Sequence, residues 1–426
     1  MKVNLPIVDY TTKNGIKVSL LPIPSSSIVS LDLQYDVGSA DWTEGKTGLA
    51  HLFEHMMFQG SKNVAKNDHI NIIQKLGGAA NAFTSFDHTV FTEMGPAEHL
   101  ETFLWLESDR LGFFLETLDE EKFLNQQQVV RNERLQRYDN QPYGLTYEKL
   151  LSNIFDKNHP YSVPVIGWMK DIESYTLEDV RGFYKKYYTP SNLSMAIAGN
   201  FDVNEAIDLI EKYFCEIPAG VKPEELKVKT QYNADAQKIL KYYDNITVPN
   251  YVLTWPAPLA GTKEAEVLSF VGYVLSGKKN ARLNQELVYE KQMALNIGLS
   301  SITGKYGGFS YLYTVPREGI SYTDLKDEIL ALIEYFLIAG ATEDEIELEK
   351  NSNVFGMITE LENTNSFPRL MNTMRSNFGT PNHFNEQFES LLAITNEDIV
   401  EVTKKYLFDD YLELHILPKN EEKDND

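Results

Sequence analysis

The sequence is poor in cysteine, in long apolar runs and in basic residues. Its single cysteine, Cys215, excludes an intrachain disulfide and agrees with a reducing compartment. No apolar window approaches the roughly 20 residues of a membrane-spanning helix, and the opening MKVNLPIVDY shows no signal peptide. We therefore expect a cytoplasmic protein without a membrane span, or a periplasmic one if a leader was removed before this numbering begins.

The shortage of basic residues leaves a formal net charge of −23, with 39 Lys and Arg against 62 Asp and Glu. A phosphate backbone would be repelled by such a surface, which argues against nucleic acid as a partner. Cationic peptides would be attracted to it. The same composition also occurs in acidic proteins whose charge serves only solvation, so both interpretations stay open.

The length and a partial repeat indicate two domains. At 426 residues the chain is long for a single core. TLEDVRGFYKKY begins at Thr176, and the similar TNEDIVEVTKKY begins 219 residues later at Thr395; FQGSKN and LSGKKN place Gly60 and Gly277 at nearly the same offset. We predict related domains over residues 1–217 and 229–426, joined by a Pro- and Gly-containing linker over 218–228.

Strand and helix patterns alternate irregularly within each half. IVSLDLQYDVG and LSMAIAGN have the β-branched and aromatic content of strands, whereas DVNEAIDLIEKYF is an amphipathic helix opened by Asp202. Long helices are also expected over 97–114 and 119–138. Because no regular strand–helix–strand succession is present, we predict the α+β class, with two homologous domains that each pack helices on one face of a mainly antiparallel sheet.

The stretch HLFEHMMFQG, residues 51–60, carries the clearest chemical signal. On a helix from about Thr47 to Phe58, stopped at Gly60, His51 and His55 lie one turn apart and Glu54 lies near the same face. Two imidazoles at this spacing can reach one zinc ion, and the neighbouring carboxylate can handle a proton. A catalytic zinc usually has three protein ligands, so one more is expected elsewhere in the chain.

Chance explains this motif poorly. With 8 histidines and 62 acids in the chain, H-x-x-D/E-H should occur about 0.02 times at random. Two histidines and a carboxylate on an apolar helix would also be costly to bury unless they were paired or metal-bound. The order of the residues is that of the inverted zincin signature, which indicates a hydrolase.

With this motif, nearly the whole chain resembles the pitrilysin family of zinc metallopeptidases, in its short two-domain form related to the mitochondrial processing peptidase subunits. The family's third zinc ligand is a glutamate on a long helix, seventy to eighty residues after the second histidine. In VVRNERLQRYDNQPYG this position is Glu133, 78 residues after His55. The resemblance therefore implies one Zn²⁺ per chain, held by His51, His55 and Glu133.

Two further segments extend the resemblance. GGAANAFTSFDHTVF is similar to the family's G-G-x-x-N-A-x-T-S segment, an edge strand that pairs with the substrate backbone, and this implies substrate contacts at Asn81 and Ala82. ARLNQELVYEKQ is similar to the family's arginine and tyrosine pair, which implies that Arg282 and Tyr289 stabilise the oxyanion formed when water attacks the peptide carbonyl.

Departures from the family pattern are also informative. Many members carry a second glutamate seven residues before the third ligand, where this chain has Gln126. An auxiliary acid is therefore not expected at that position. VLSFVGYVLSGKKN, which aligns with the zinc helix, contains neither histidine nor acid, so we predict no metal in the C-terminal half.

Together these features predict a zinc metalloendopeptidase that cleaves short or unfolded peptides, with Glu54 as the general base. The resemblance implies a dimeric chamber in which Arg282 and Tyr289 of one subunit complete the zinc site of the other. A homodimer is expected, and a heterodimer with a metal-free relative is the alternative. Three other functions stay open: a catalytically idle zinc-binding or structural subunit, a peptide-binding module, and a zinc hydrolase acting on another substrate class.

Overall fold

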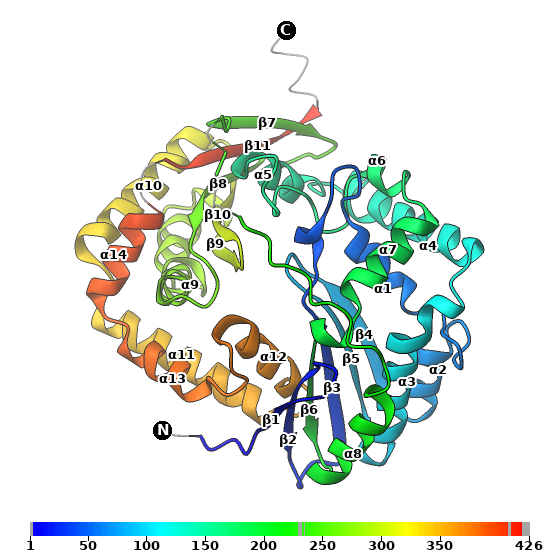
Figure 1. Ribbon diagram of the computed structural model, residues 1–426. Helices are drawn as coiled ribbons and strands as arrows, with labels where there is room; N and C mark the ends of the chain where they lie inside the picture. The colour runs from blue at the N-terminus through cyan, green and yellow to red at the C-terminus, as the bar shows by residue number, and fades with distance from the viewer. Residues whose placement is uncertain (1–2, 229–231, 234, 408–409, 420–426) are drawn as a thin grey trace. The chain divides into compact units, whose positions relative to one another are not determined.

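The computed structural model describes residues 3–228, 232–233, 235–407 and 410–419, which form two compact units (Figure 1). Unit 1 takes its described residues from Met1–Leu135, Val163–Lys227 and Met357–Asn385. Unit 2 takes its described residues from Gln136–Ser162, Val228–Gly356 and Glu386–Asp426. Each unit thus includes a segment from the opposite half of the sequence. The two related domains predicted over residues 1–217 and 229–426 remain a prediction. Residues 229–231, at the start of the second of these, lie outside the described residues.

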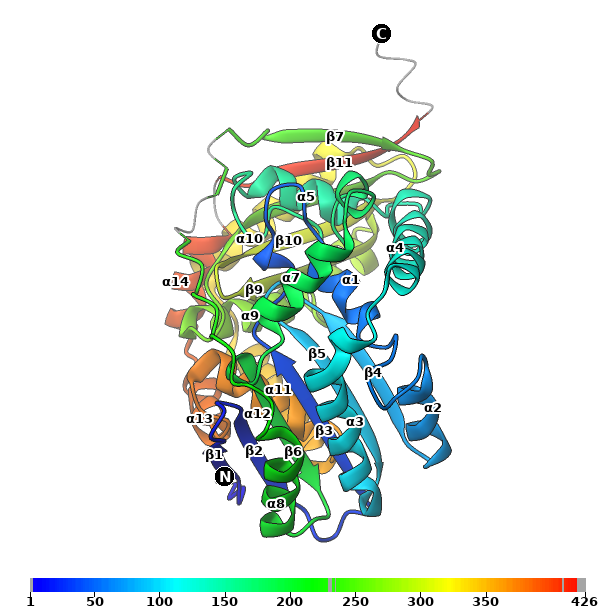
Figure 2. The same cartoon turned by 45° about the vertical axis from the view of Figure 1, so that its right-hand side comes forward.

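Unit 1 is built on a sheet with the strand order β1-β2-β6-β3-β5-β4, in which every neighbouring pair is antiparallel except β2 with β6. The strands are β1 (Val8–Thr11), β2 (Lys17–Pro22), β3 (Ile28–Tyr35), β4 (Ala79–Thr84), β5 (Thr89–Pro96) and β6 (Leu193–Gly199). Strand β3 is buried along almost its whole length, as expected of a central strand covered on both faces. Strand β4 lies at the end of the sheet (Figure 2).

Helices from the N-terminal half cover one face of this sheet. They are α1 (Leu49–Met56), α2 (Asp68–Lys75), α3 (Leu100–Phe113), α4 (Glu120–Arg134), α6 (Met169–Ile172), α7 (Leu177–Tyr187) and α8 (Val203–Phe214). On this face Tyr35 of β3 lies against Phe91 of β5 and against Tyr188, and Phe53 of α1 lies 4.3 Å from the Tyr188 ring. Such aromatic packing buries a large apolar area and fixes α1 against the sheet.

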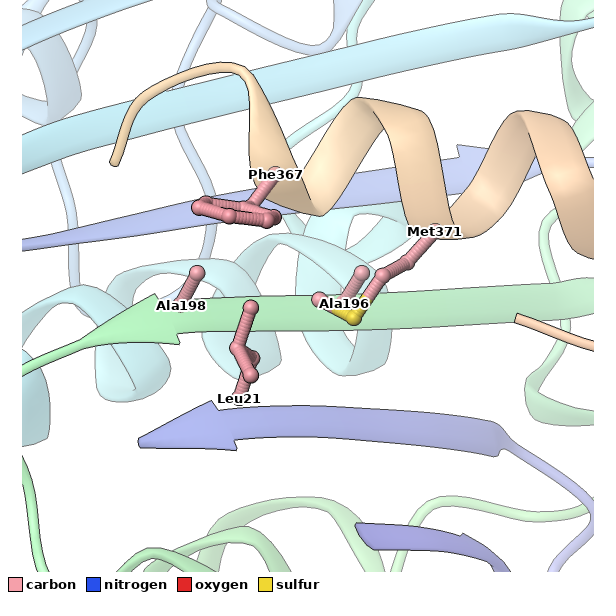
Figure 3. Packing of buried hydrophobic residues seen from close by; sticks show 5 residues of the cluster. All are labelled: Leu21, Ala196, Ala198, Phe367 and Met371. Atoms are coloured by element: carbon pink, nitrogen blue, oxygen red, sulfur yellow. The ribbon is translucent and has the colours of Figure 1, made fainter. Parts of the chain in front are cut away.

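The opposite face is covered by α12 (Phe367–Phe378), which comes from the C-terminal half. Phe367 and Met371 pack on Leu21, Ala196 and Ala198 (Figure 3). Because side chains alternate along a strand, the small residues Ala196 and Ala198 face this helix while their neighbours in β6 face the other layer. Small residues let α12 approach the sheet closely.

Unit 2 has a five-stranded sheet in the order β7-β11-β8-β10-β9, antiparallel except for β7 with β11. Its strands are β7 (Ile239–Asp244), β8 (Asn250–Ala257), β9 (Ala294–Gly304), β10 (Gly307–Pro316) and β11 (Leu412–Pro418). Its helices are α5 (Thr146–Ile154), α9 (Lys263–Ser276), α10 (Tyr322–Ala339) and α14 (Asn396–Tyr406), while α11 (Glu343–Glu362) and α13 (Phe384–Ala393) run across the division between the units in the sequence. Leu150 of α5 packs on Val252, Leu414 and Ile416, so this sheet too is covered by a helix from the other half.

The two repeated segments found in the sequence form equivalent helices. Helix α7 and helix α14 each contain 11 residues and begin with a capping box, formed by Thr176 with Asp179 and by Thr395 with Asp398. The same local chemistry therefore starts both helices.

The predicted α+β class with two mainly antiparallel sheets is confirmed. The structure adds one helix on the second face of each sheet, α12 in unit 1 and α5 in unit 2. Among the described residues, no helix has the length and apolar character that crossing a bilayer requires.

Candidate metal centre

The start of α1 is fixed by a loop that follows it by more than a hundred residues. The Thr47 hydroxyl donates to Asp171 Oδ2 at 2.6 Å and accepts from the Trp168 amide at 3.0 Å. Gly48, the N-cap residue, has a φ of 84° and lies so close to Ile166 that a Cβ would come within 2.3 Å of its carbonyl oxygen. Only glycine suits both the left-handed backbone and the close approach.

Helix α1 separates its residues into two faces. Leu49, Leu52, Phe53 and Met56 are buried, while the half-buried His51, Glu54 and His55 face away from the core. The His51 and His55 rings lie 4.9 Å apart between centroids. This separation of polar and apolar faces follows from the 3.6-residue period, and it places both imidazoles on the same face of the helix.

Helix α4 brings the third residue to this face. The Glu133 Oε2 atom lies 3.2 Å from His55 Nε2 and 3.8 Å from His51 Nε2. One ligand atom from each of the three residues lies within 4.8 Å of the others. Donor atoms bound to one tetrahedral zinc at about 2.0–2.1 Å would be about 3.4 Å apart. The two imidazoles and the carboxylate therefore fit a zinc ion in both chemistry and spacing.

The same loop that holds α1 also holds α4. The Arg134 guanidinium, next to Glu133, donates to the Gly167 carbonyl at 2.7 Å and is buried. Gly167 itself packs against the backbone of Thr47 and Gly48. One loop therefore sets the spacing between the two helices that carry the candidate ligands. Gln126, two turns before Glu133, is buried and bonds to Asn125 at 2.9 Å.

The proposed base contacts the end of the edge strand. The Thr84 hydroxyl in β4 donates to Glu54 Oε2 at 2.6 Å. A hydroxyl donor to a carboxylate oxygen restricts rotation of the side chain. Thr84 lies in the N-A-x-T-S segment of the sequence, where nothing marks it as the partner of Glu54.

Strand β4 carries the two predicted substrate-contacting residues. Asn81 is exposed and Ala82 half-buried, and they pair with Thr92 and Phe91 of β5. Within the described residues β4 pairs with β5 alone, so its outer edge offers backbone groups to another strand.

Arg282 and Tyr289 belong to unit 2 and are described within it. The Nε and Nη2 atoms of Arg282 each donate to Glu345 at 2.6 Å, and the guanidinium lies 4.9 Å from the Phe336 ring centroid. Tyr289 is about half exposed, in the π-helical segment Asn284–Glu290. A π-helix is wider than an α-helix, so residues seven apart along it lie on different faces than they would on an α-helix.

A second cluster of ionisable groups, which the sequence analysis did not predict, is buried in unit 1. His69 Nε2 lies 2.5 Å from Glu93 Oε1 and 4.0 Å from Glu107 Oε1, and Arg110 is hydrogen-bonded to Glu107. Burial raises the pKa of both carboxyls, opposed by Arg110, and burial lowers the pKa of His69. The Arg110 guanidinium is therefore the buried counter-charge of these carboxyl groups.

Comparison with known proteins gives a consistent set of similarities. Residues 17–167 match the family described as Insulinase (Peptidase family M16), and residues 174–353 match the Peptidase M16 inactive domain. The chain is 27% identical over 407 residues to a zinc protease, PqqE, of Helicobacter pylori, covering 94% of this chain and 90% of that protein. It is 24% identical to the uncharacterized zinc protease YmxG of Bacillus subtilis, covering 94% of this chain and 96% of that protein.

The solved structures agree in fold. A crystal structure of a protease from Helicobacter pylori covers 97% of this chain and all of its own, with a TM-score of 0.89 at 24% identity. A structure titled as a peptidase M16 inactive domain from Pseudomonas fluorescens gives a TM-score of 0.86 at 17% identity, covering 97% of this chain and 98% of its own.

Proposed function

Because this chain belongs to the M16 peptidase family, we propose that it is a zinc-dependent endopeptidase that hydrolyses short or unfolded peptides. The observation that carries the proposal is the meeting of two imidazoles and a carboxylate, from His51, His55 and Glu133, within 4.8 Å. Its relatives named as zinc proteases support the same activity.

The three residues would hold one Zn²⁺ per chain and leave a fourth position open, as catalytic zinc sites do. When bound, zinc supplies Lewis-acid activation of water and of the peptide carbonyl. Glu54, which lies between the two histidines on α1, would take a proton from the attacking water and deliver one to the leaving amine. Thr84, which bonds Glu54 Oε2 at 2.6 Å, fixes the orientation of that carboxylate.

The outer edge of β4 binds the substrate backbone in this proposal. Main-chain hydrogen bonds from an edge strand hold an extended peptide largely without regard to its sequence. Asn81 and Ala82 are then the residues in contact with the peptide. Folded proteins present few free strands, so unfolded segments and short peptides are the expected substrates.

Arg282 and Tyr289 would stabilise the developing oxyanion at the zinc site of a second subunit. Glu345 binds the Nε and Nη2 atoms of Arg282, whereas its buried Nη1 atom has no hydrogen-bond partner among the described residues. A guanidinium already oriented by a carboxylate loses little freedom when it binds a further oxygen. The proposed assembly is a homodimer with two active sites; a heterodimer with a metal-free relative is the alternative.

One competing function has a specific observation in its favour. The match of residues 174–353 to a domain described as inactive is what a zinc-binding but catalytically idle subunit would also give. The presence of Glu54 between the two histidines argues for activity, because an idle zinc site has no need of a base.

The test is cleavage of a mixed peptide library by the purified full-length protein, with and without a chelator, read by mass spectrometry. We expect cleavage that the chelator abolishes and added zinc restores. Glu54→Gln should retain zinc at one ion per chain but lose turnover by a factor of about 10³ or more. Glu205→Gln, on the exposed first turn of α8, serves as the matched control and should cleave normally.

Each other outcome identifies an alternative. Zinc binding without cleavage by the wild-type protein would indicate the idle subunit, and peptide binding that the chelator leaves unchanged would indicate a binding module. Normal cleavage by Glu54→Gln would refute its role as the base.

A further inference from the structure

An exposed arginine of α12 lies over the edge strand on the sheet face opposite α1. The guanidinium carbon of Arg369 lies 3.9 Å from the centroid of the Phe83 ring in β4. Within the described residues, this guanidinium makes no hydrogen bond or ion pair, so its donors are available to a ligand. A cation stacked on an aromatic face is held in place without using those donors.

Helix α12 is firmly attached to the sheet, which fixes where Arg369 can reach. The Asn372 amide donates to Asp32 Oδ1 at 2.6 Å and is completely buried. Arg375 donates to Ser19 Oγ at 2.7 Å, and Ser376 bonds His88 Nε2 at 2.9 Å. Three polar contacts and the packing of Phe367 and Met371 therefore hold the helix at both ends (Figure 3).

The alternation of side chains along β4 separates this contact from the candidate metal centre. Thr84 points to Glu54 of α1, whereas its neighbour Phe83 points to Arg369 of α12. A peptide added to the outer edge of β4 would lie about 4.8 Å from it, with alternate side chains on each face. Those on the α12 face would pass beside the Phe83 ring, within reach of the Arg369 guanidinium.

We propose that Arg369, stacked on Phe83, is a specificity residue that selects an acidic side chain at one position of the bound peptide. The inference rests on the proposed peptidase function and adds to it the charge of one substrate position. A carboxylate fits the planar donor pair of a guanidinium, and the partial exposure of the site limits the effect to a modest preference.

One acidic group of the protein that interacts electrostatically with Arg369, Asp32, leaves this preference largely intact. Asp32 is buried, and burial raises its pKa to about 6 although Asn372 and Arg369 both act to lower it. Asp32 Oδ1 accepts a hydrogen bond from Asn372, and among the described residues no hydrogen bond or ion pair joins Asp32 to Arg369. The overall charge of −23 would still attract basic peptides at long range, but a contact at one side chain is decided locally.

The experiment compares cleavage profiles of the full-length wild type, Arg369→Ala and Arg369→Glu on one peptide library. Wild type should favour Asp or Glu over Lys or Arg by about 5- to 10-fold at one position, or at positions two residues apart. Arg369→Ala should reduce the preference to within about twofold, and Arg369→Glu should reverse it toward Lys and Arg at the same position. On a peptide with Gln at that position, the rates of the three proteins should differ much less than on peptides with Asp or Glu there.

A matched control separates local from general charge effects. Arg181→Ala removes an exposed arginine of α7, which is paired with Glu178 on the other helical layer, and should leave the profile unchanged. Cleavage by wild type without any acidic preference, or the same preference in all three proteins, would overturn the assignment of Arg369 while leaving the peptidase proposal intact. Absence of any chelator-sensitive cleavage would overturn both.

Discussion

The hydroxyl of Thr84 donates a 2.6 Å hydrogen bond to Oε2 of Glu54, which joins the last residue of edge strand β4 to the helix that carries both candidate zinc ligands. A peptide bound along β4 is therefore connected directly to the proposed base. Removing the hydroxyl should leave the carboxylate free to rotate away from the reacting atoms.

We predict that Thr84→Val lowers kcat by about 10- to 100-fold, since a hydrogen bond to a charged group contributes about 1.5–3 kcal/mol. KM should stay within about twofold, because the backbone edge that binds the peptide is unchanged. Steady-state kinetics on one fluorogenic peptide measure both constants. Thr84→Ser restores the hydroxyl and should recover most of kcat, and zinc content should be the same in all three proteins. A loss of zinc in Thr84→Val would instead indicate a role in folding of the site.

A second prediction concerns the assembly. Glu54→Gln and Arg282→Ala should each be inactive as homodimers. A heterodimer of the two, isolated after co-expression with different affinity tags, should recover about half of the wild-type activity, because one of its two sites then contains no substitution. The measurement is specific activity per zinc ion.

A zinc site completed by Arg282 of the same chain would give a different activity for the heterodimer. If Arg282 served the zinc site of its own chain, every site in the heterodimer would carry one defect, and activity would stay at the level of the single variants. Glu345→Gln provides a milder check: it removes the charge that orients Arg282 at 2.6 Å and should lower kcat without abolishing it.

Local patterns in the sequence predicted helices and strands well where a capping residue or a regular alternation of apolar residues marks them. The helix expected from Asp202 is confirmed as Val203–Phe214 with Asp202 as its N-cap, and the strand in LSMAIAGN is confirmed as Leu193–Gly199. The helix expected from about Thr47 to Phe58 is present as Leu49–Met56. Side-chain capping and alternation are short-range properties, so the sequence reveals them directly.

Long-range relationships could not be predicted in the same way. Nothing near Arg369 or Asn372 in the sequence shows that α12 packs on a sheet more than 150 residues earlier in the chain. His69, Glu93 and Glu107 lie on three different elements, and each alone has the pattern of an ordinary polar residue. Tyr289 lies in the π-helical segment Asn284–Glu290, which begins two residues after Arg282, and such i+5 bonding depends on the surroundings rather than on the local sequence.

Asp32 provides a prediction for stability against pH. Burial raises its pKa from 3.8 to about 6, so the folded protein binds the proton more tightly than the unfolded chain. The stability that Asp32 contributes is complete below pH 3.8 and is lost as pH rises through about 6. Relative to Asp32→Asn, which mimics the protonated acid, wild type should lose up to about 3 kcal/mol of unfolding free energy between pH 4 and pH 7.5. Urea denaturation across this range measures the difference.

The matched control for this prediction is Asp208→Asn, which removes an exposed carboxylate on α8 and should change stability by no more than about 0.5 kcal/mol. The contrary outcome is a difference in unfolding free energy between wild type and Asp32→Asn that does not change with pH. It would mean that Asp32 is ionised at no cost in the folded state, because Asn372 and Arg369 compensate its burial fully.

The last prediction concerns the buried cluster around Arg110, whose guanidinium is 2% exposed and lies 4.1 Å from the Phe91 ring centroid. Arg110→Met should cost about 3–5 kcal/mol of unfolding free energy, because it leaves Glu107 and Glu93 without a counter-charge in the core. Arg110→Met combined with Glu107→Met should be more stable than Arg110→Met alone, since the second change removes the stranded carboxylate. Arg181→Met, at a surface ion pair, should change stability by no more than about 0.5 kcal/mol. Chemical denaturation of the four proteins measures these differences, and a double variant no more stable than Arg110→Met would show that packing, rather than charge balance, determines the contribution of Arg110.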